Sequence, residues 1–253
     1  MQTSVTAAEL CRLIGTTPAA DEQESGTWRF VLRRVAAGDA LFRQGSAMRN
    51  VYVVRSGFFK SVYVRGTIEH VIAFSMTGDC VGLESVGADL HAVDAVALTD
   101  AEVAIVPYAF LQQTDSGQRL PARLLLKLLC RENAHKARLV GLLGYPSALA
   151  RVAAFLLAQG EAFAELGYSR KSFILPMRNC DIGSYLGLRA ETVCRSVAAL
   201  KSAGHIDVEL RCYVLKDEAA LRGIADNERS RSPTKQAAHT VVRGTPAAPQ
   251  AAA

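Results

Sequence analysis

Asp181-Ile-Gly-Ser-Tyr-Leu-Gly-Leu-Arg-Ala-Glu-Thr-Val-Cys-Arg195, running on to Gly204, is the segment that decides the fold. Its first part has one apolar helical face, and Gly187 follows where the chain must turn sharply, because glycine supplies the backbone angles that a turn needs. After the turn, apolar residues recur at helical spacing: Val193, Val197 and Leu200. The glycine that ends the segment suits a helix C-terminus. The pattern predicts a helix-turn-helix, whose second helix enters the major groove of DNA.

Two side chains of the predicted second helix are suited to reading bases. Glu191 and Arg195 are four residues apart, so they project from one helix face, away from the apolar side. A carboxylate accepts a hydrogen bond from the cytosine amino group, and a guanidinium binds both acceptors of guanine. The same spacing also fits an ordinary Glu–Arg pair on a solvated helix. The residues alone leave both interpretations open.

The segment resembles the helix-turn-helix of the Crp/Fnr family of bacterial transcription regulators, in its Fnr branch. That branch has D-I-G-N-Y-L-G-L followed by E-T-x-S-R, and the resemblance extends over roughly residues 28 to 222. Two residues depart from the pattern. Cys194 stands where the branch has Ser, and Arg189 stands where a Thr or Ser usually caps the recognition helix, so we expect a weaker cap. The resemblance implies a dimeric regulator that binds a TTGAT-like inverted repeat in double-stranded DNA and contacts RNA polymerase.

The resemblance also implies roles for individual residues at the DNA. Glu191 and Arg195 would read a G·C pair, and Cys194 would lie against a thymine. The Crp branch has an arginine at the position of Ala190 that reads an additional base, so its absence favours the Fnr-type site. Four more residues are candidates for phosphate contacts, which position a protein without specifying sequence: Arg178, Asn179, Arg189 and Lys201.

Composition restricts the classes of protein that remain. The 253 residues, 50% of them hydrophobic, suffice for two domains, and a net charge of +5 suits a polyanionic partner without proving one. No apolar run is long enough to cross a membrane and no signal peptide is visible, so we expect a cytoplasmic protein. The six cysteines are scattered without a C-x-x-C motif, which favours reduced thiols over a structural zinc site. No phosphate loop or hydrolase motif appears, so neither catalytic residues nor an enzyme is predicted.

The sequence divides into segments of different character, and the predicted fold class is α+β. Residues 1–27 read as a loose or partly helical arm. Short β-type runs between glycine turns over 28–115 predict an antiparallel, jelly-roll-like β-roll, which resembles the family's sensor domain. Residues 116–144 predict a long dimerisation helix, and 145–225 a winged helix-turn-helix domain. Residues 226–253, rich in Ala, Pro, Ser and basic residues, predict a disordered tail.

The long helix carries a heptad seam, the signature of two helices packed along each other. Six residues follow the 3-4-3-4-3 spacing: Leu126, Leu129, Asn133, Lys136, Val140 and Leu143. In the resembled family this helix forms the homodimer interface. Asn133 would cost stability while fixing the register, and Lys136 would face its symmetry mate unless it bends outward or finds a carboxylate. The alternative is one helix packed on its own β-roll through other leucines, such as Leu125, Leu128 and Leu142.

The sensor region lacks the ligand motifs of its relatives. Cyclic-nucleotide-binding members hold the cyclic phosphate with an Arg-Ser pair, but no arginine lies between Arg65 and Arg119 here. Because a buried phosphate needs a cationic partner, cyclic nucleotide is not expected. Iron–sulfur clusters require four thiolates. Members of the Fnr branch often supply them from the arm and the β-roll, where this chain has only Cys11 and, in the place of the β-roll ligand, Ala104. No cluster is expected either.

Other sensing chemistry stays open. His70 and His91 are candidate axial ligands for haem, although an isolated histidine is more often an ordinary surface or core residue. The alternative function is therefore a haem- or thiol-based redox or gas sensor with the same DNA-binding domain. Oxidation of Cys194 beside Arg195 would add bulk and negative charge against DNA, whereas an inert thiol that replaces Ser is the simpler interpretation.

Overall fold

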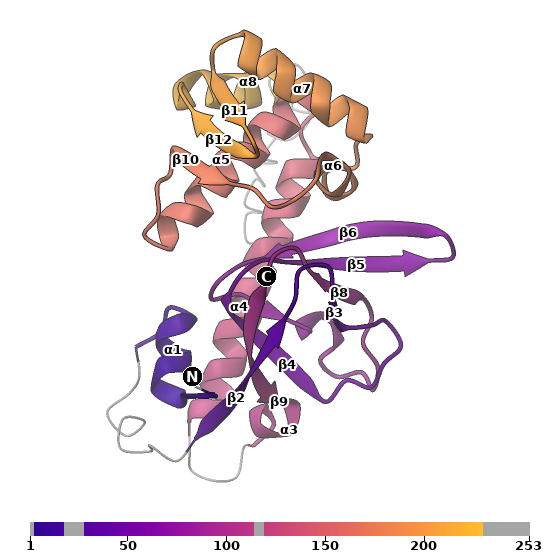
Figure 1. The fold of residues 1–253 in the computed structure, drawn as a ribbon, viewed down its shortest axis with the longest axis vertical. Helices are drawn as coiled ribbons and strands as arrows, with labels where there is room; N and C mark the ends of the chain where they lie inside the picture. The colour runs from indigo at the N-terminus through magenta and orange to yellow at the C-terminus, as the bar shows by residue number, and fades with distance from the viewer. Residues whose placement is uncertain (1–2, 18–27, 114–118, 230–253) are drawn as a thin grey trace, which may run out of the picture.

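The computed structural model describes residues 3–17, 28–113 and 119–229 of the chain. Figure 1 shows two parts, a β-roll at the bottom and a helical domain with a small sheet at the top, both lying along the long helix α4 (Leu120–Leu143). In the described residues, no helix is both long and apolar enough to cross a membrane.

The β-roll consists of two antiparallel sheets with strand orders β1-β2-β9-β4-β7 and β3-β8-β5-β6. Inward-facing side chains of both sheets, such as Val54, Phe59 and Val103, are fully buried against one another. The strands and short helices of this part are β1 Ser4–Thr6, β2 Arg29–Val35, β3 Ala40–Phe42, β4 Asn50–Ser56, β5 Phe59–Arg65, β6 Ile68–Ser75, β7 Cys80–Val81, the 3-10 helix η1 Leu83–Ser85, β8 Asp94–Ala97, β9 Ala101–Pro107 and α3 Tyr108–Leu111. The long β5–β6 hairpin projects beneath α6 of the upper part (Figure 1).

The N-terminal segment is partly helical, one of the two predicted forms, and it packs on the β-roll and α4 rather than forming a separate arm. Strand β1 pairs with β2, and α1 (Ala7–Leu13) follows it directly. Thr6 and Glu9 form a capping box that stabilises the first turn of α1. Leu10 and Ile14 are buried in one cluster with leucines of α4. Residues 18–27, the rest of the predicted arm, lie outside the described residues.

The upper part packs helices against a three-stranded sheet of order β10-β12-β11. Its elements are α5 Ala148–Glu165, β10 Ser172–Ile174, α6 Asn179–Leu186, α7 Ala190–Ser202, β11 Ile206–Glu209, β12 Cys212–Leu215 and α8 Glu218–Arg229. Phe155, Leu186 and Val193 are fully buried in its core. Helix α8 continues past residue 225, where the disordered tail was predicted to begin. The remainder of that predicted tail, 230–253, lies outside the described residues.

Candidate nucleic-acid interface

The turn between α6 and α7 is built around two glycines. Gly187 has a φ of 65° and ends α6, a left-handed conformation that favours glycine. Gly183 permits a close approach, because a Cβ atom there would lie 2.8 Å from the carbonyl oxygen of Leu188. The backbone N–H of Leu188 donates to the oxygen of Gly183 at 2.8 Å. The predicted helix-turn-helix is present, and its second helix is α7.

Helix α7 has one buried and one exposed side. Val193 and Leu200 are buried against the domain core, whereas Glu191, Cys194 and Arg195 are exposed. Within the described part of the chain, the side chain of neither Glu191 nor Arg195 has a hydrogen bond or ion pair. The i,i+4 pair that could have explained their spacing is therefore not formed, and both side chains are available to a ligand.

The start of α7 lacks a side-chain cap. Arg189 occupies the N-cap position with extended backbone angles, and its side chain makes no capping hydrogen bond. The expected weaker cap is thereby confirmed. The first backbone N–H groups of a helix without such a cap stay available to an anion, and the exposed Arg189 guanidinium adds positive charge beside them.

The remaining predicted phosphate-contact residues have partners within the protein. Arg178 is exposed over 65% of its side chain, and its Nε lies 3.4 Å from Asp181. Asn179 donates to Cys194 Sγ at 2.9 Å. Lys201 donates to the carbonyl oxygen of Val208 at 3.0 Å.

Lys201 binds to the wing, which is the β11–β12 hairpin. Its Nζ also lies 3.0 Å from Asp207, whose pKa is lowered to about 2 by hydrogen bonds from Lys201 and Lys216. These contacts hold its ammonium group beside the wing, with the side chain 52% exposed, and the phosphate contact of Lys201 stays a prediction. Leu210 and Arg211 form the turn between the two strands of the wing. Both have positive φ, and Leu210 is 93% exposed.

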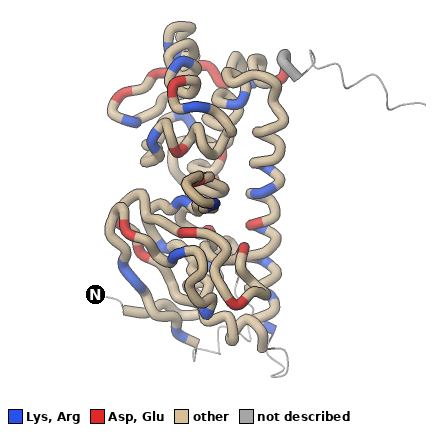
Figure 2. The backbone as a smooth tube through the Cα atoms, turned by 90° about the vertical axis from the view of Figure 1, so that its right-hand side faces the viewer, with Lys and Arg blue, Asp and Glu red and all other residues tan. Residues whose placement is uncertain are grey.

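Positive charge is not gathered at the helix-turn-helix alone. Figure 2 shows Lys and Arg positions interspersed with Asp and Glu positions in both parts of the chain. Individual side chains therefore decide what the exposed side of α7 can bind. An unpaired carboxylate, a thiol and a guanidinium on one helix side are suited to the hydrogen-bonding edges of base pairs.

Comparison with known proteins agrees with this geometry. The family model of the cyclic nucleotide-binding domain matches residues 32–114, and that of the Crp-like helix-turn-helix domain matches residues 150–224. The fumarate and nitrate reduction regulatory protein of Vibrio cholerae is 30% identical over 193 residues, which cover 76% of this chain and 77% of that protein. The chain belongs to the Crp/Fnr family. It is therefore a DNA-binding transcription regulator and not an enzyme, as predicted.

Two further relatives support the assignment to the Crp/Fnr family. Electron transport regulator A of Shewanella oneidensis is 28% identical over 197 residues, covering 77% of this chain and 78% of that protein. The solved structure of FixK2 from Bradyrhizobium japonicum superposes with a TM-score of 0.69 at 28% identity, covering 77% of this chain and 96% of the other. The antiparallel β-roll followed by a helix and a winged helix-turn-helix is thus the fold of this family.

The predicted seam of this Crp/Fnr regulator lies on the surface of the chain. Leu126, Leu129, Val140 and Leu143 are 63%, 40%, 70% and 41% exposed, and Asn133 and Lys136 between them are exposed as well. The opposite side of α4 is buried in the same chain through other leucines: Leu124, Leu128 and Leu142. Helix α4 thus packs on the β-roll through Leu124 and Leu128 and on the helical domain through Leu142, and it leaves the seam exposed. Lys136 forms an ion pair with a carboxylate of the same helix, with its Nζ 3.3 Å from Oε1 of Glu132.

A cavity of about 200 Å³ lies between the β-roll and α4. Its polar lining includes the buried hydroxyls of Ser61 and Ser75 and the carboxyls of Glu84 and Glu132. Burial raises the pKa of Glu84, and the charge of Glu132 raises it further. Among the described residues that line the cavity, the cationic one is Lys136, which already faces Glu132. This lining suits a phosphate poorly.

The residues considered for other cofactors are dispersed. His70 is exposed on β6, whereas His91 is buried and stacks on Phe42 with 3.7 Å between ring centroids. Cys11, a residue of α1, is fully buried. In the described ranges, no three His, Cys, Asp or Glu side chains are grouped as metal ligands would be. Whether the protein binds haem or a cluster stays a prediction.

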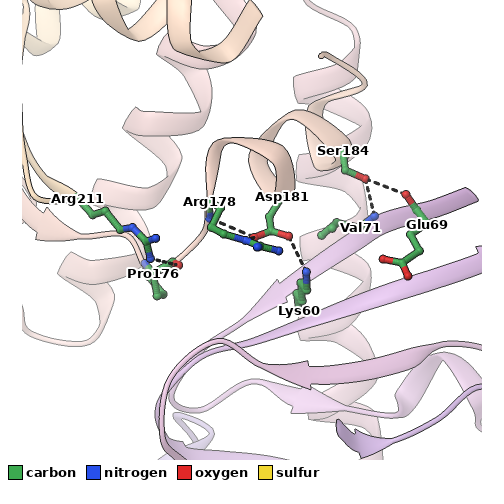
Figure 3. Close-up of polar contacts among 8 residues, drawn as sticks. All are labelled: Lys60, Glu69, Val71, Pro176, Arg178, Asp181, Ser184 and Arg211. Atoms are coloured by element: carbon green, nitrogen blue, oxygen red, sulfur yellow. Dashed lines mark hydrogen bonds and ion pairs between the residues drawn. The ribbon is translucent and has the colours of Figure 1, made fainter. Parts of the chain in front are cut away.

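The sequence patterns did not reveal how α6 rests on the β-roll. Asp181 Oδ1 accepts a hydrogen bond from Lys60 Nζ of β5 at 2.6 Å. Ser184 Oγ accepts from the backbone N–H of Val71 at 2.9 Å and donates to the carbonyl oxygen of Glu69 at 3.4 Å, both on β6 (Figure 3). These residues are more than a hundred positions apart in sequence, so no local spacing could have indicated the contact.

Proposed function

We propose that this Crp/Fnr regulator acts as a homodimer that binds a TTGAT-like inverted repeat. The observation that carries the dimer is the exposed seam of α4, in which four apolar side chains flank Asn133 and Lys136. Such a row at heptad spacing buries its apolar surface when it meets a second copy. A two-fold dimer would present two copies of α7 to half-sites about one helical turn of DNA apart.

Base readout is proposed to come from α7, with Glu191 and Arg195 on a G·C pair and Cys194 beside a thymine. Their exposure and the unpaired state of the two charged groups support this assignment. Four residues are proposed to position the helix on phosphates: Arg178, Asn179, Arg189 and Lys201. RNA polymerase is proposed as the protein partner, by analogy with the family.

The sensor domain is proposed to work without cyclic nucleotide, iron–sulfur cluster or haem. The carboxyl-lined cavity supports the proposal that no cyclic nucleotide binds. Among the described residues that line it, the cationic one is Lys136, which is already paired with Glu132 and so is not free for a phosphate. Adding cyclic nucleotide should leave the DNA affinity unchanged, and anaerobic reconstitution with iron and sulfide should give no stoichiometric cluster. A cyclic nucleotide that tightens DNA binding, or four bound irons per protomer, would contradict the proposal.

The dimer and its site can be tested together with a matched pair of variants. Leu126→Glu places a charge in the seam, whereas Lys127→Glu changes the neighbouring exposed residue outside it. We expect wild type and Lys127→Glu to have the mass of a dimer in solution and to prefer a TTGAT inverted repeat over a scrambled duplex. Leu126→Glu should be a monomer that binds weakly. A monomeric wild type without preference for the repeat would refute the proposal.

A further inference from the structure

The carboxylate of Asp181 lies where the DNA-binding domain meets the sensor domain. Its Oδ1 accepts from Lys60 Nζ at 2.6 Å, and its Oδ2 accepts from the backbone N–H of Arg178 at 3.1 Å (Figure 3). The side chains of Lys60 and Asp181 are 13% and 5% exposed, so this ion pair is shielded from water. Arg178 shares the same carboxylate from its exposed side, with Nε 3.4 Å away. Asp181 therefore has one buried and one exposed cationic neighbour.

We infer that Lys60, a residue of the sensor domain, is a positioning residue for DNA binding: it neutralises Asp181 and so leaves Arg178 free to contact a DNA phosphate. The inference rests on the proposed function, in which Arg178 is a phosphate contact. A buried carboxylate must be compensated by a nearby charge. Because Lys60 supplies that charge, the Arg178 guanidinium keeps its terminal nitrogens for a ligand.

Loss of Lys60 would change the partner of Asp181 and leave the rest of the interface in place. A carboxylate without Lys60 would draw the Arg178 guanidinium into a two-nitrogen contact, since Arg178 starts the same helical turn. The DNA would then lose one phosphate contact per protomer. Other contacts would still hold α6 on β6, namely the two hydrogen bonds of Ser184 and the ring contact of Tyr185 with Phe74, at 4.9 Å between centroids.

The test measures binding of the full-length protein to a TTGAT inverted-repeat duplex over a series of salt concentrations. Lys60→Met should lower the affinity about 10-fold, and its salt slope should be shallower by about 1.8, because a dimer would lose two phosphate contacts. Lys127→Met removes the same charge from an exposed position on α4 and should keep the wild-type slope. Lys60→Arg retains the charge and should also bind as wild type does.

Adding Asp181→Asn to Lys60→Met separates the effect of the Asp181 charge on Arg178 from the effect of domain docking. Lys60→Met with Asp181→Asn removes both charges and keeps an acceptor for the backbone N–H of Arg178, so affinity and slope should return close to wild type. Asp181→Asn alone should bind with a slope at least as steep as that of wild type. Circular dichroism and thermal unfolding of each variant would show that it is folded. If Lys60→Met alone does not fold, the double variant and Asp181→Asn still test the role of Arg178.

Several results would overturn the inference. Tighter or unchanged DNA binding of Lys60→Met would refute it, and tighter binding would show that the Lys60–Asp181 contact restrains α7. A double variant as weak as Lys60→Met would show that docking of the domains matters, and not release of Arg178. A wild-type protein that binds DNA without preferring the repeat would instead refute the proposed site, and the salt slopes on that DNA would still report on Lys60.

Discussion

The side-chain nitrogen Nδ2 of Asn179 lies 2.9 Å from Sγ of Cys194 and joins the first residue of α6 to the exposed side of α7. The contact fixes the thiol at the position where the Fnr branch has Ser. It uses one N–H of the Asn179 amide, and the second N–H is left for the proposed phosphate contact. Recognition near the thymine therefore depends on a pair of residues from both helices.

Cys194→Ser should sharpen the preference for thymine. A hydroxyl is smaller than a thiol and a stronger hydrogen-bond partner, so it can keep the contact with Asn179 and still approach the base. The measurement is the affinity for the inverted repeat and for duplexes with each thymine replaced in turn. Cys130→Ser, at an exposed position on α4, is the control. If the thymine preference of Cys194→Ser equals that of wild type, Cys194 has no special role in readout.

The same variants test whether Cys194 is an oxidative switch. We expect an inert thiol that merely replaces Ser. Mild peroxide should then weaken DNA binding of wild type and Cys194→Ser equally. A loss confined to wild type and reversed by reductant would show instead that oxidation of this sulfur blocks the DNA.

Arg195→Ala and Lys201→Ala should have different effects on DNA binding. Loss of a bidentate guanine contact should cost about 1–3 kcal/mol and relax specificity at one base pair in each half-site. Lys201 holds the wing through Asp207 and Val208, so its loss should lower affinity slightly and equally for all sequences. Competition binding with a library of half-site variants would measure both. Identical specificity profiles would show that these roles are wrongly assigned.

Gly183→Ala should destabilise the helix-turn-helix. The new Cβ would lie 2.8 Å from the carbonyl oxygen of Leu188 and 3.3 Å from the nitrogen of Ala190, so α6 and the start of α7 must move apart. Overpacking of this kind costs about 1–3 kcal/mol. Gly223→Ala in α8 meets no atom within 4 Å and should be neutral or stabilising by up to about 1 kcal/mol. Urea unfolding compares the two, and equal stabilities would contradict the close-approach argument.

Local periodicity explains what could be predicted from the sequence. The two helices of the DNA-binding motif, the glycine turn and the wing depend on neighbouring residues, and the structure has them where the patterns indicated. The seam of α4 was also visible, because its heptad spacing separates the exposed Leu126 and Val140 from the buried Leu128 and Leu142.

Contacts between distant segments could not be predicted in this way. The N-terminal arm carried one usable signal, the Thr6-x-x-Glu9 capping box, but its packing against α4 depends on tertiary structure. The charge and position of Lys201 indicated a phosphate contact, but its ion pair with Asp207 depends on the folded wing and could not be predicted. The pair Lys60 and Asp181 joins two domains, so neither residue could be recognised from its own surroundings in the sequence.

The ion pair of Lys60 and Asp181 should make folding stability depend on acid pH. Burial alone would raise the pKa of Asp181, but the hydrogen bonds from Lys60 and the Arg178 backbone, with the charges of both side chains, hold it below its ordinary value of 3.8. A lowered pKa in the folded state gives stability that is fully present above the unfolded pKa and is lost as pH falls through the folded pKa.

The free energy of unfolding of wild type should therefore decrease below roughly pH 4 more steeply than that of the double variant carrying Lys60→Met and Asp181→Asn. Urea unfolding between neutral pH and the acid limit of native structure would measure both curves. Asp207→Asn serves as a control, since Asp207 also has a lowered pKa but lies on the exposed wing. Its curve should keep the steep fall that depends on Asp181. Parallel curves for wild type and the double variant would mean that the Asp181 carboxylate is no better stabilised in the folded protein than in the unfolded chain.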